Sequence, residues 1–184
     1  MGIGKIQEEE LSAYFKEISS GNEAALERFY EEYGRFMLTL ILSIVKSRES
    51  AEEVLQDVLM AIVTEGRRVV IRNAKGWLFK VLRNLSMRKA KEDHMMETES
   101  LSDKETIQSG EDVQERIEDK VDQIEALKCL DQIEQQCVLM CVFGDMKLPQ
   151  VAEVLGIPYD KVRNKYGYAV RKLRKYYGGR FDPA

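Results

Sequence analysis

The chain of 184 residues contains only three prolines, three cysteines, one histidine and one tryptophan. Scarce proline, together with the lack of alternating apolar and polar residues, favours helices over strands. The longest nearly uncharged apolar stretch, residues 36–45, is about half the length of the roughly 20 residues that a membrane-spanning helix needs. We therefore expect an all-α protein without membrane insertion. Because neither a secretory leader nor a lipidation signal opens the chain, we expect it to be cytoplasmic.

The three cysteines, Cys129, Cys137 and Cys141, lie in one apolar segment and form no even framework for disulfides. Such cysteine usage fits a reducing compartment. Together with the single histidine, His94, they make four possible zinc ligands, but no CxxC or HxxxC pair exists. The sequence favours buried structural thiols over a metal site and predicts no cofactor.

The sequence also contains no glycine-rich phosphate loop and no grouped acid, base and nucleophile motif. Both kinds of pattern would be expected of the common nucleotide-dependent and hydrolytic enzymes. We therefore predict that the protein is not an enzyme.

Charge is distributed in blocks that the formal net charge of −4 conceals. Residues 1–66 carry −7 and residues 67–91 carry +9. Residues 92–125 carry −10 and residues 126–184 carry +4. The two basic blocks suit a polyanionic partner.

Apolar residues spaced three and four apart predict a helical domain in the first part of the chain, with a short helix near residues 8–18. Ser20 and Ser50, each followed by a glutamate three positions later, predict capping boxes for two longer helices. Asn73 can cap a further helix over residues 74–91. The predicted apolar face of that helix consists of Leu78, Val81, Leu82 and Leu85.

Residues 92–121 are expected to form an acidic flexible linker, because this segment has too few apolar side chains to fold alone. Its acidity either mimics nucleic acid in a basic channel or keeps the segment solvated. Helical periodicity then resumes. The predicted organisation is therefore a domain over 1–91, the linker, and a second helical domain over 122–184.

The second domain contains a helix-turn-helix pattern. A short helix over residues 148–155 has proline in its first turn, Gly156 and Pro158 form the turn, and a longer helix begins near Tyr159. Its inward positions are Val162, Tyr166, Ala169 and Leu173. Residues 161–175 include seven basic side chains and no acidic one, which is typical of a recognition helix. A basic helix face can also be solvated surface.

A second basic feature lies on the helix predicted over residues 74–91. Lys80, Asn84, Arg88 and Lys91 share a stripe with Trp77. Bases of single-stranded nucleic acid stack on aromatic rings while cations follow the backbone. Trp77 can also be a core residue, and both interpretations hold if one edge of the ring packs and the other is exposed.

Four segments closely resemble extracytoplasmic-function (ECF) sigma factors of bacterial RNA polymerase, which belong to the sigma-70 family. They are residues 50–58, 73–85, 151–157 and 169–173. The resemblance implies that residues 1–91 are sigma region 2, which binds core polymerase and melts the −10 promoter element. It implies that residues 122–184 are region 4, which reads the −35 element and contacts the polymerase β flap, with the linker threading through the enzyme between them.

The same resemblance implies roles for individual residues. Docking on the β′ clamp helices is expected of Glu53, Gln56 and Asp57. Contacts to the −10 element are expected of Lys75, Trp77, Lys80, Arg83, Asn84 and Arg88. Contacts to the −35 element are expected of Lys161, Arg163, Asn164, Lys165, Tyr168 and Arg171. An anti-sigma factor is a further expected partner.

The length of the linker is compatible with this interpretation. As a coil it would span about 30 Å, and fully stretched roughly 110 Å. Promoter elements about 17 base pairs apart are separated by roughly 58 Å, which lies between these limits. The alternative is a helix-turn-helix repressor or activator that works without core polymerase; it would leave the basic, tryptophan-bearing helix of the first domain unexplained.

Overall fold

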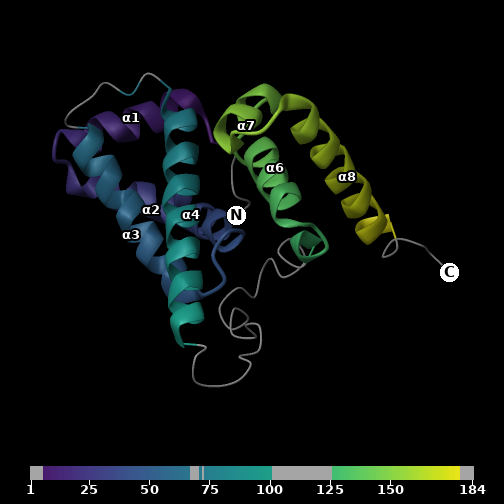
Figure 1. Ribbon diagram of the computed structural model, residues 1–184. Helices are drawn as coiled ribbons and strands as arrows, with labels where there is room; N and C mark the ends of the chain where they lie inside the picture. Colours follow the sequence, from purple (N-terminus) through teal and green to yellow (C-terminus); the bar gives the residue numbers. More distant parts are fainter. Residues whose placement is uncertain (1–5, 67–70, 72, 101–125, 179–184) are drawn as a thin grey trace. The chain divides into compact units, whose positions relative to one another are not determined.

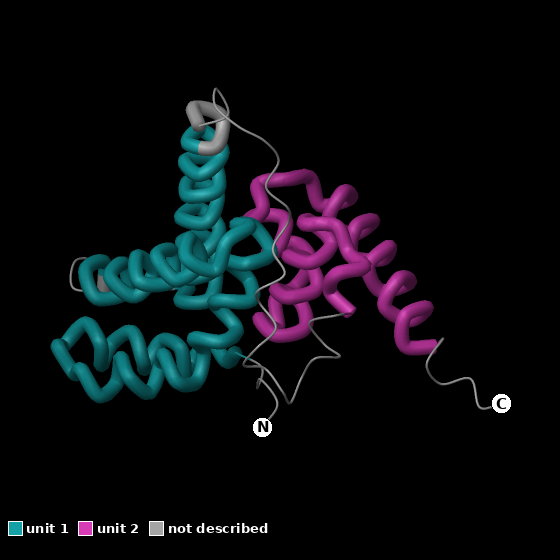
Figure 2. The backbone as a smooth tube through the Cα atoms, turned by 90° about the horizontal axis from the view of Figure 1, so that it is seen from below, with its two compact units in different colours: residues 1–110 teal, residues 111–184 magenta. Residues whose placement is uncertain are grey.

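The computed structural model describes residues 6–66, 71, 73–100 and 126–178, and these residues form helices and turns without a strand (Figure 1). They divide into two compact units between Gly110 and Glu111, coloured separately in Figure 2. The predicted class, all-α with two small helical domains, is confirmed. Within the described ranges, no helix is both long enough and apolar enough to cross a membrane.

The first unit is built from α1 (Glu8–Ser19), α2 (Glu23–Leu42), α3 (Arg48–Gly66) and α4 (Ala74–Ser100). Each of these four helices packs against the other three, and α3 makes the most extensive contacts (Figure 1). The apolar side chains that recur three and four apart along α3, from Ala51 to Val63, are buried or half-buried, and the acidic side of this helix is exposed.

Two of the predicted helix caps are wrong. Helix α2 is capped by Asn22, whose side chain accepts a hydrogen bond from the amide three residues on at 3.3 Å. The hydroxyl of Ser20 instead donates to a carbonyl at the end of α1 at 2.7 Å. Likewise Ser47 accepts from the amide of Ser50 at 3.0 Å, which places Ser50 inside the first turn of α3. In both cases a better-placed cap residue lies two or three positions away from the predicted one.

The buried face of α4 is rotated from the predicted one. It consists of Ala74, Leu78, Phe79, Leu82 and Ser86. Val81 and Leu85, predicted to be inside, are only half-buried. The ring of Phe79 packs edge-on against Phe36 of α2 at 5.7 Å between centroids. This large ring turns the helix so that the opposite, basic stripe faces outward.

Helix α4 also continues nine residues beyond Lys91, the end predicted from charge. Arg88 pairs with Glu92 at 3.6 Å and Lys89 pairs with Asp93 at 3.5 Å, each one helical turn on. Such pairs favour helix where composition alone suggests coil. The first nine residues of the predicted linker are therefore helical, and its remainder lies outside the described residues.

The second unit contains α6 (Gln132–Val142), α7 (Leu148–Leu155) and α8 (Tyr159–Gly178), with α6 packed against both of the others. Gly156 ends α7 at φ 64°, a left-handed conformation that favours glycine. The predicted helix-turn-helix is confirmed, with Val162 and Ala169 buried in α8 and Tyr166 and Leu173 half-buried.

Candidate nucleic-acid interface

The basic stripe of α4 forms the first candidate interface. Lys80, Asn84, Arg88 and Lys91 are exposed, and they lie three or four residues apart on the side opposite the buried face. Trp77 lies at the start of the stripe and is half-buried. The structure thus brings together four of the six residues predicted to contact the −10 element: Trp77, Lys80, Asn84 and Arg88.

Lys75 and Arg83, the other two predicted −10 residues, are half-buried and lie off this stripe. Helical geometry places Lys75 on the opposite side of α4 from Lys80 and Asn84, and Arg83 about a quarter turn from the stripe. The two side chains therefore do not belong to the surface that the stripe forms.

Trp77 packs edge-on against Phe15 of α1, with 5.4 Å between ring centroids and 81° between planes. One side of the indole is therefore fixed by the core, while part of the side chain remains accessible. A ring held in this way can stack with little loss of conformational entropy. The structure is compatible with both interpretations of this tryptophan that the sequence left open.

The start of α4 is held by two caps. Asn73 accepts a hydrogen bond from the amide of Gly76 at 2.8 Å, as predicted. From α1, the carboxylate of Glu8 accepts from the amides of Ala74 at 2.6 Å and Lys75 at 3.0 Å. A carboxylate on the first amides of a helix satisfies donors that have no partner in the helix and interacts favourably with the helix dipole. Glu8 therefore fixes the end of α4 nearest Trp77.

The residues predicted to bind core polymerase, Glu53, Gln56 and Asp57, form one exposed patch on α3. Two of them pair with α4: Arg88 donates to Asp57 at 3.0 Å, and Lys89 donates to Glu53. The hydrogen bond to Glu53 raises the pKa of Lys89 above its ordinary value. The predicted polymerase-binding and DNA-binding surfaces of this unit therefore meet at the Arg88–Asp57 pair.

The second candidate interface is the outer side of α8. Asn164, Tyr168 and Arg171 are exposed and three or four residues apart. The guanidinium of Arg171 lies over the ring of Tyr168 at 4.6 Å from its centroid, a cation–π geometry. Lys161 and Arg163 flank this group and are exposed. The structure thus brings together five of the six predicted −35 residues: Lys161, Arg163, Asn164, Tyr168 and Arg171.

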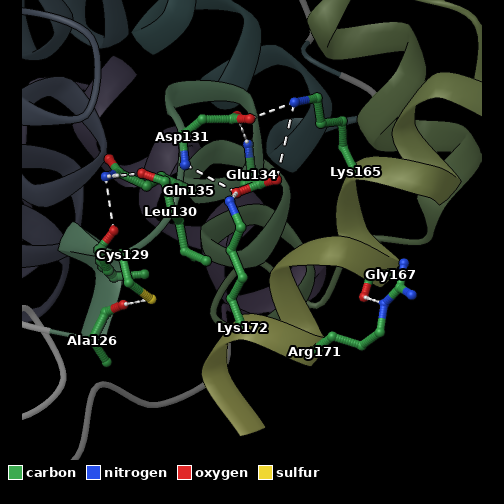
Figure 3. Close-up of polar contacts among 11 residues, drawn as sticks. Ala126, Cys129, Leu130, Asp131, Glu134, Gln135, Lys165, Gly167, Arg171 and Lys172 are labelled. Atoms are coloured by element: carbon green, nitrogen blue, oxygen red, sulfur yellow. Dashed lines mark hydrogen bonds and ion pairs between the residues drawn. The ribbon is translucent and has the colours of Figure 1, made fainter. Parts of the chain in front are cut away.

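Lys165, the sixth, lies on the side of α8 that faces α6 (Figure 3). Its ammonium donates to Asp131, and this hydrogen bond raises the pKa of Lys165. Burial alone would raise the pKa of Asp131, but the hydrogen bonds from Lys165 and from the backbone of Glu134 hold it below its ordinary value. Lys172 reaches the same region and donates to Glu134 at 2.6 Å.

The cysteines are only partly as predicted. Cys137 is buried and Cys141 is half-buried, and burial raises their thiol pKa values to about 12 and about 11. Cys129 is exposed, because it precedes α6, where the chain turns at the edge of the unit. Its thiol donates to the carbonyl of Ala126 at 2.9 Å.

Sequence reasoning missed three acids that hold the basic helices. Asp131 and Glu134 form a capping box at the start of α6, and the Asp-x-x-Glu spacing could have revealed it. Their pairing with lysines more than 30 residues away carries no local signal. The contact of Glu8 with α4 spans 66 residues of sequence and likewise carries no local signal.

The geometry defines a two-unit, all-α protein with one basic aromatic helix and one helix-turn-helix. The family model of sigma-70 region 2 matches residues 29–93, and that of sigma-70 region 4 matches residues 126–175. Comparison with curated proteins gives no match. Among solved structures, the sigma factor RpoE from Bartonella quintana, in complex with the anti-sigma factor NepR, shares 19% identity and a TM-score of 0.59. That match covers 85% of this chain and 99% of RpoE.

CnrH, solved in complex with the cytosolic domain of CnrY, shares 18% identity and a TM-score of 0.57, covering 92% of this chain and 98% of CnrH. At 18–19% identity, these two matches support the assignment of the fold alone. The two family models, which together match more than half of the residues, show that the chain belongs to the sigma-70 family, as an alternative sigma factor. The predicted membership of the sigma-70 family is confirmed.

Proposed function

We propose that the protein binds core RNA polymerase and directs it to promoters, with the first unit opening the −10 element and the second reading the −35 element. The observation that carries this proposal is the presence of one outward basic face in each unit, Trp77 to Lys91 on α4 and Lys161 to Arg171 on α8. A protein that only reads duplex DNA needs one such face.

The composition of the α4 face supports contact with an opened strand. An indole anchored on Phe15 offers a rigid stacking surface, and Lys80 and Arg88 are placed one and three turns along the same helix to follow phosphates. Asn84, between them, can form paired hydrogen bonds with a base edge. Together these side chains combine stacking, charge and base reading on a single helix face.

The composition of the α8 face supports reading of a duplex. Asn164 and Arg171 are side chains that can bond bidentately to base edges in the major groove. Lys161 and Arg163 can contact phosphates and fix the register of the helix. Tyr168, stacked under Arg171, restricts the guanidinium to fewer conformations. Lys165 stays a prediction, because its ammonium is directed at α6.

We propose the exposed α3 patch, Glu53, Gln56 and Asp57, as the docking surface for the β′ clamp helices. The fold shared with RpoE, solved with an anti-sigma factor, supports an anti-sigma factor as a second partner. Because sigma-70 factors act by binding core polymerase, we propose that the protein works in the cytoplasm as a binding factor and not as an enzyme.

The decisive experiment is run-off transcription with purified core polymerase on a library of promoter fragments. We expect transcripts that start at defined sites only when the protein is added. If no such transcript forms while the isolated protein binds duplex sites tightly, the repressor or activator alternative is correct and the proposal fails.

Variants separate the two proposed surfaces. Asn164→Ala should weaken discrimination at the −35 element while core binding, measured by gel filtration, is retained. Gln56→Ala should weaken core binding while leaving −35 discrimination by the assembled holoenzyme unchanged. Equal loss of both properties in either variant would contradict the division of roles.

A further inference from the structure

Four charged side chains connect α6 to the flank of α8 (Figure 3). Glu134 is only 3% exposed, and its carboxylate accepts from Lys172 at 2.6 Å and lies 4.0 Å from Lys165. Asp131 accepts from Lys165 and also from the amide of Glu134 at 2.9 Å. Two cations of the recognition helix are therefore paired with acids of a neighbouring helix.

Other charged residues of α8 are arranged differently. Arg171 lies over Tyr168 on the outer side, and Arg163 pairs within the helix with Asp160 at 3.2 Å. These contacts leave both guanidinium groups on an exposed surface. Lys165 and Lys172 are the cations of this helix that the structure draws toward α6 (Figure 3).

The burial of Glu134 makes these pairs hard to exchange. A DNA phosphate could take the place of a carboxylate as the partner of Lys172, but Glu134 would then be a buried, unpaired charge. A phosphate cannot compensate Glu134, since both are anions. The capping box adds to this constraint, because the carboxylate of Asp131 accepts from the amide of Glu134 at 2.9 Å and that of Glu134 accepts from the amide of Asp131 at 3.0 Å.

We propose that Asp131 and Glu134 determine specificity by withholding Lys165 and Lys172 from the DNA backbone. Phosphate contacts strengthen binding to every sequence alike, whereas base contacts discriminate between sequences. A recognition helix with two fewer phosphate contacts depends more on its base-reading side chains, Asn164 and Arg171. This inference rests on the proposed function of the second unit as a reader of duplex DNA.

The variant Glu134→Gln tests the proposal in the full chain. Glutamine has the same shape and serves equally in a capping box, so the start of α6 is retained. The variant removes the charge that pairs with Lys172, whereas Lys165 keeps its hydrogen bond to Asp131. The probe is a 30-base-pair duplex of arbitrary sequence, with binding followed by fluorescence anisotropy from 200 to 50 mM salt.

We expect the salt dependence of log K to become steeper by about 0.9, the contribution of one additional phosphate contact from Lys172. Over this salt range the affinity should then rise by a further factor of about 3 compared with the wild type. Adding Lys172→Gln to Glu134→Gln should remove this gain. An unchanged salt dependence in Glu134→Gln would overturn the proposal.

Asp145→Asn is the matched control, because it removes one exposed negative charge from the same unit away from the lysine pairs. Asparagine tolerates the positive φ of 49° at this position. We expect little change in salt dependence. A change as large as that of Glu134→Gln would show a general effect of net charge and would also overturn the proposal.

A second measurement does not depend on DNA. Lysine acetylation rates, measured on the full chain by mass spectrometry, should be lower at Lys165 and Lys172 than at Lys161 and Lys175. The difference should diminish in Glu134→Gln. Equal acetylation rates at all four lysines in the wild type would refute the proposal that Lys165 and Lys172 are held by the two acids. This readout remains valid even if Glu134→Gln destabilises the unit.

Failure of the proposed function has a different signature. Arg171→Gln removes an outer-face cation and should make the salt dependence shallower by about 0.9. If it has no effect while the lysine reactivities are as expected, α8 does not contact the duplex and the proposed function is wrong. In that case the pairing would be present without a role in DNA specificity, and the inference would be rejected with it.

Discussion

The two units secure their basic helices in different ways. In the first, Arg88 of α4 and Asp57 of α3 are 3.0 Å apart, with side chains 59% and 56% exposed. In the second, Lys172 of α8 pairs with Glu134, whose side chain is 4% exposed. The same type of contact, between a cation of a basic helix and an acid of its neighbour, is thus exposed in one unit and half-buried in the other.

This difference separates an exchangeable contact from a fixed one. Exposed ion pairs contribute little free energy, so DNA or polymerase can take either partner of the Arg88–Asp57 pair at small cost. Because these residues belong to the two proposed binding surfaces, engaging one releases the other. Separating a buried carboxylate from its cation costs much more free energy, so the Lys172–Glu134 pair between α8 and α6 acts as part of the fold.

The largest effect is expected from Lys172→Ala, which leaves Glu134 buried with Lys165 at 4.0 Å as its nearest cation. Because Lys172 is itself half-exposed, we expect a loss of about 2–3 kcal/mol in the free energy of unfolding of the second unit, below the range for fully buried pairs. Hydrogen exchange of α6 and α8 peptides measures it. The exposed neighbour substitution Lys175→Ala should change exchange little; equal effects of the two would contradict the buried-acid model.

The next largest effect is expected in the first unit from Glu8→Ala. The substitution leaves the amides of Ala74 and Lys75 without their acceptor, and the loss of such a cap costs about 1–2 kcal/mol. Urea unfolding followed by Trp77 fluorescence reports on this helix directly. Glu9→Ala, at an exposed neighbouring position, serves as the control and should leave the midpoint within error.

Glycines in the two basic helices should respond with opposite signs. A Cβ at Gly76 would lie 2.6 Å from the side chain of Asn73, so Gly76→Ala should displace the cap of α4 and cost about 1 kcal/mol. A Cβ at Gly167 meets nothing within 4 Å, so Gly167→Ala should stabilise α8 by up to about 1 kcal/mol. Thermal unfolding of the two variants tests this. A destabilised Gly167→Ala would mean that α8 is constrained by something other than helix propensity.

The smallest effect is expected from the exposed pair. Arg88→Gln, Asp57→Asn and the double variant should each change stability by about 0.5 kcal/mol or less, and the coupling energy should be of the same size. Urea unfolding with Trp77 fluorescence provides the double-mutant cycle. A coupling as large as that of Lys172 with Glu134 would erase the contrast between the units.

Patterns within one helix were predictable from sequence. The stripe of α4, the buried side of α3 and the helix-turn-helix each follow from spacings of three and four residues, and the structure has them as expected. The orientation of α4 was less well predicted, because Phe79 packs on Phe36 across the bundle and rotates the helix. Local spacing does not reveal the size of the space that a partner helix offers.

Contacts between distant segments were not predictable. Lys165 reads as one of several cations on α8, and only the position of Asp131, 34 residues away, directs it to α6. Glu8 looks like one of three consecutive glutamates until its carboxylate is seen on the amides of α4. Such contacts depend on how whole helices pack, which a single sequence does not specify residue by residue.

Helix α4 continues without a break to Ser100, and its length therefore sets the direction in which the chain leaves the helix. Each residue of an α-helix advances the chain by about 1.5 Å and turns it by about 100°. The nine residues after Lys91 therefore fix not only how far from the bundle the chain departs but also in which direction around the axis it does so. Inserting one residue among them would redirect the departing chain by more than a quarter turn, whereas the same insertion in coil would change its length alone.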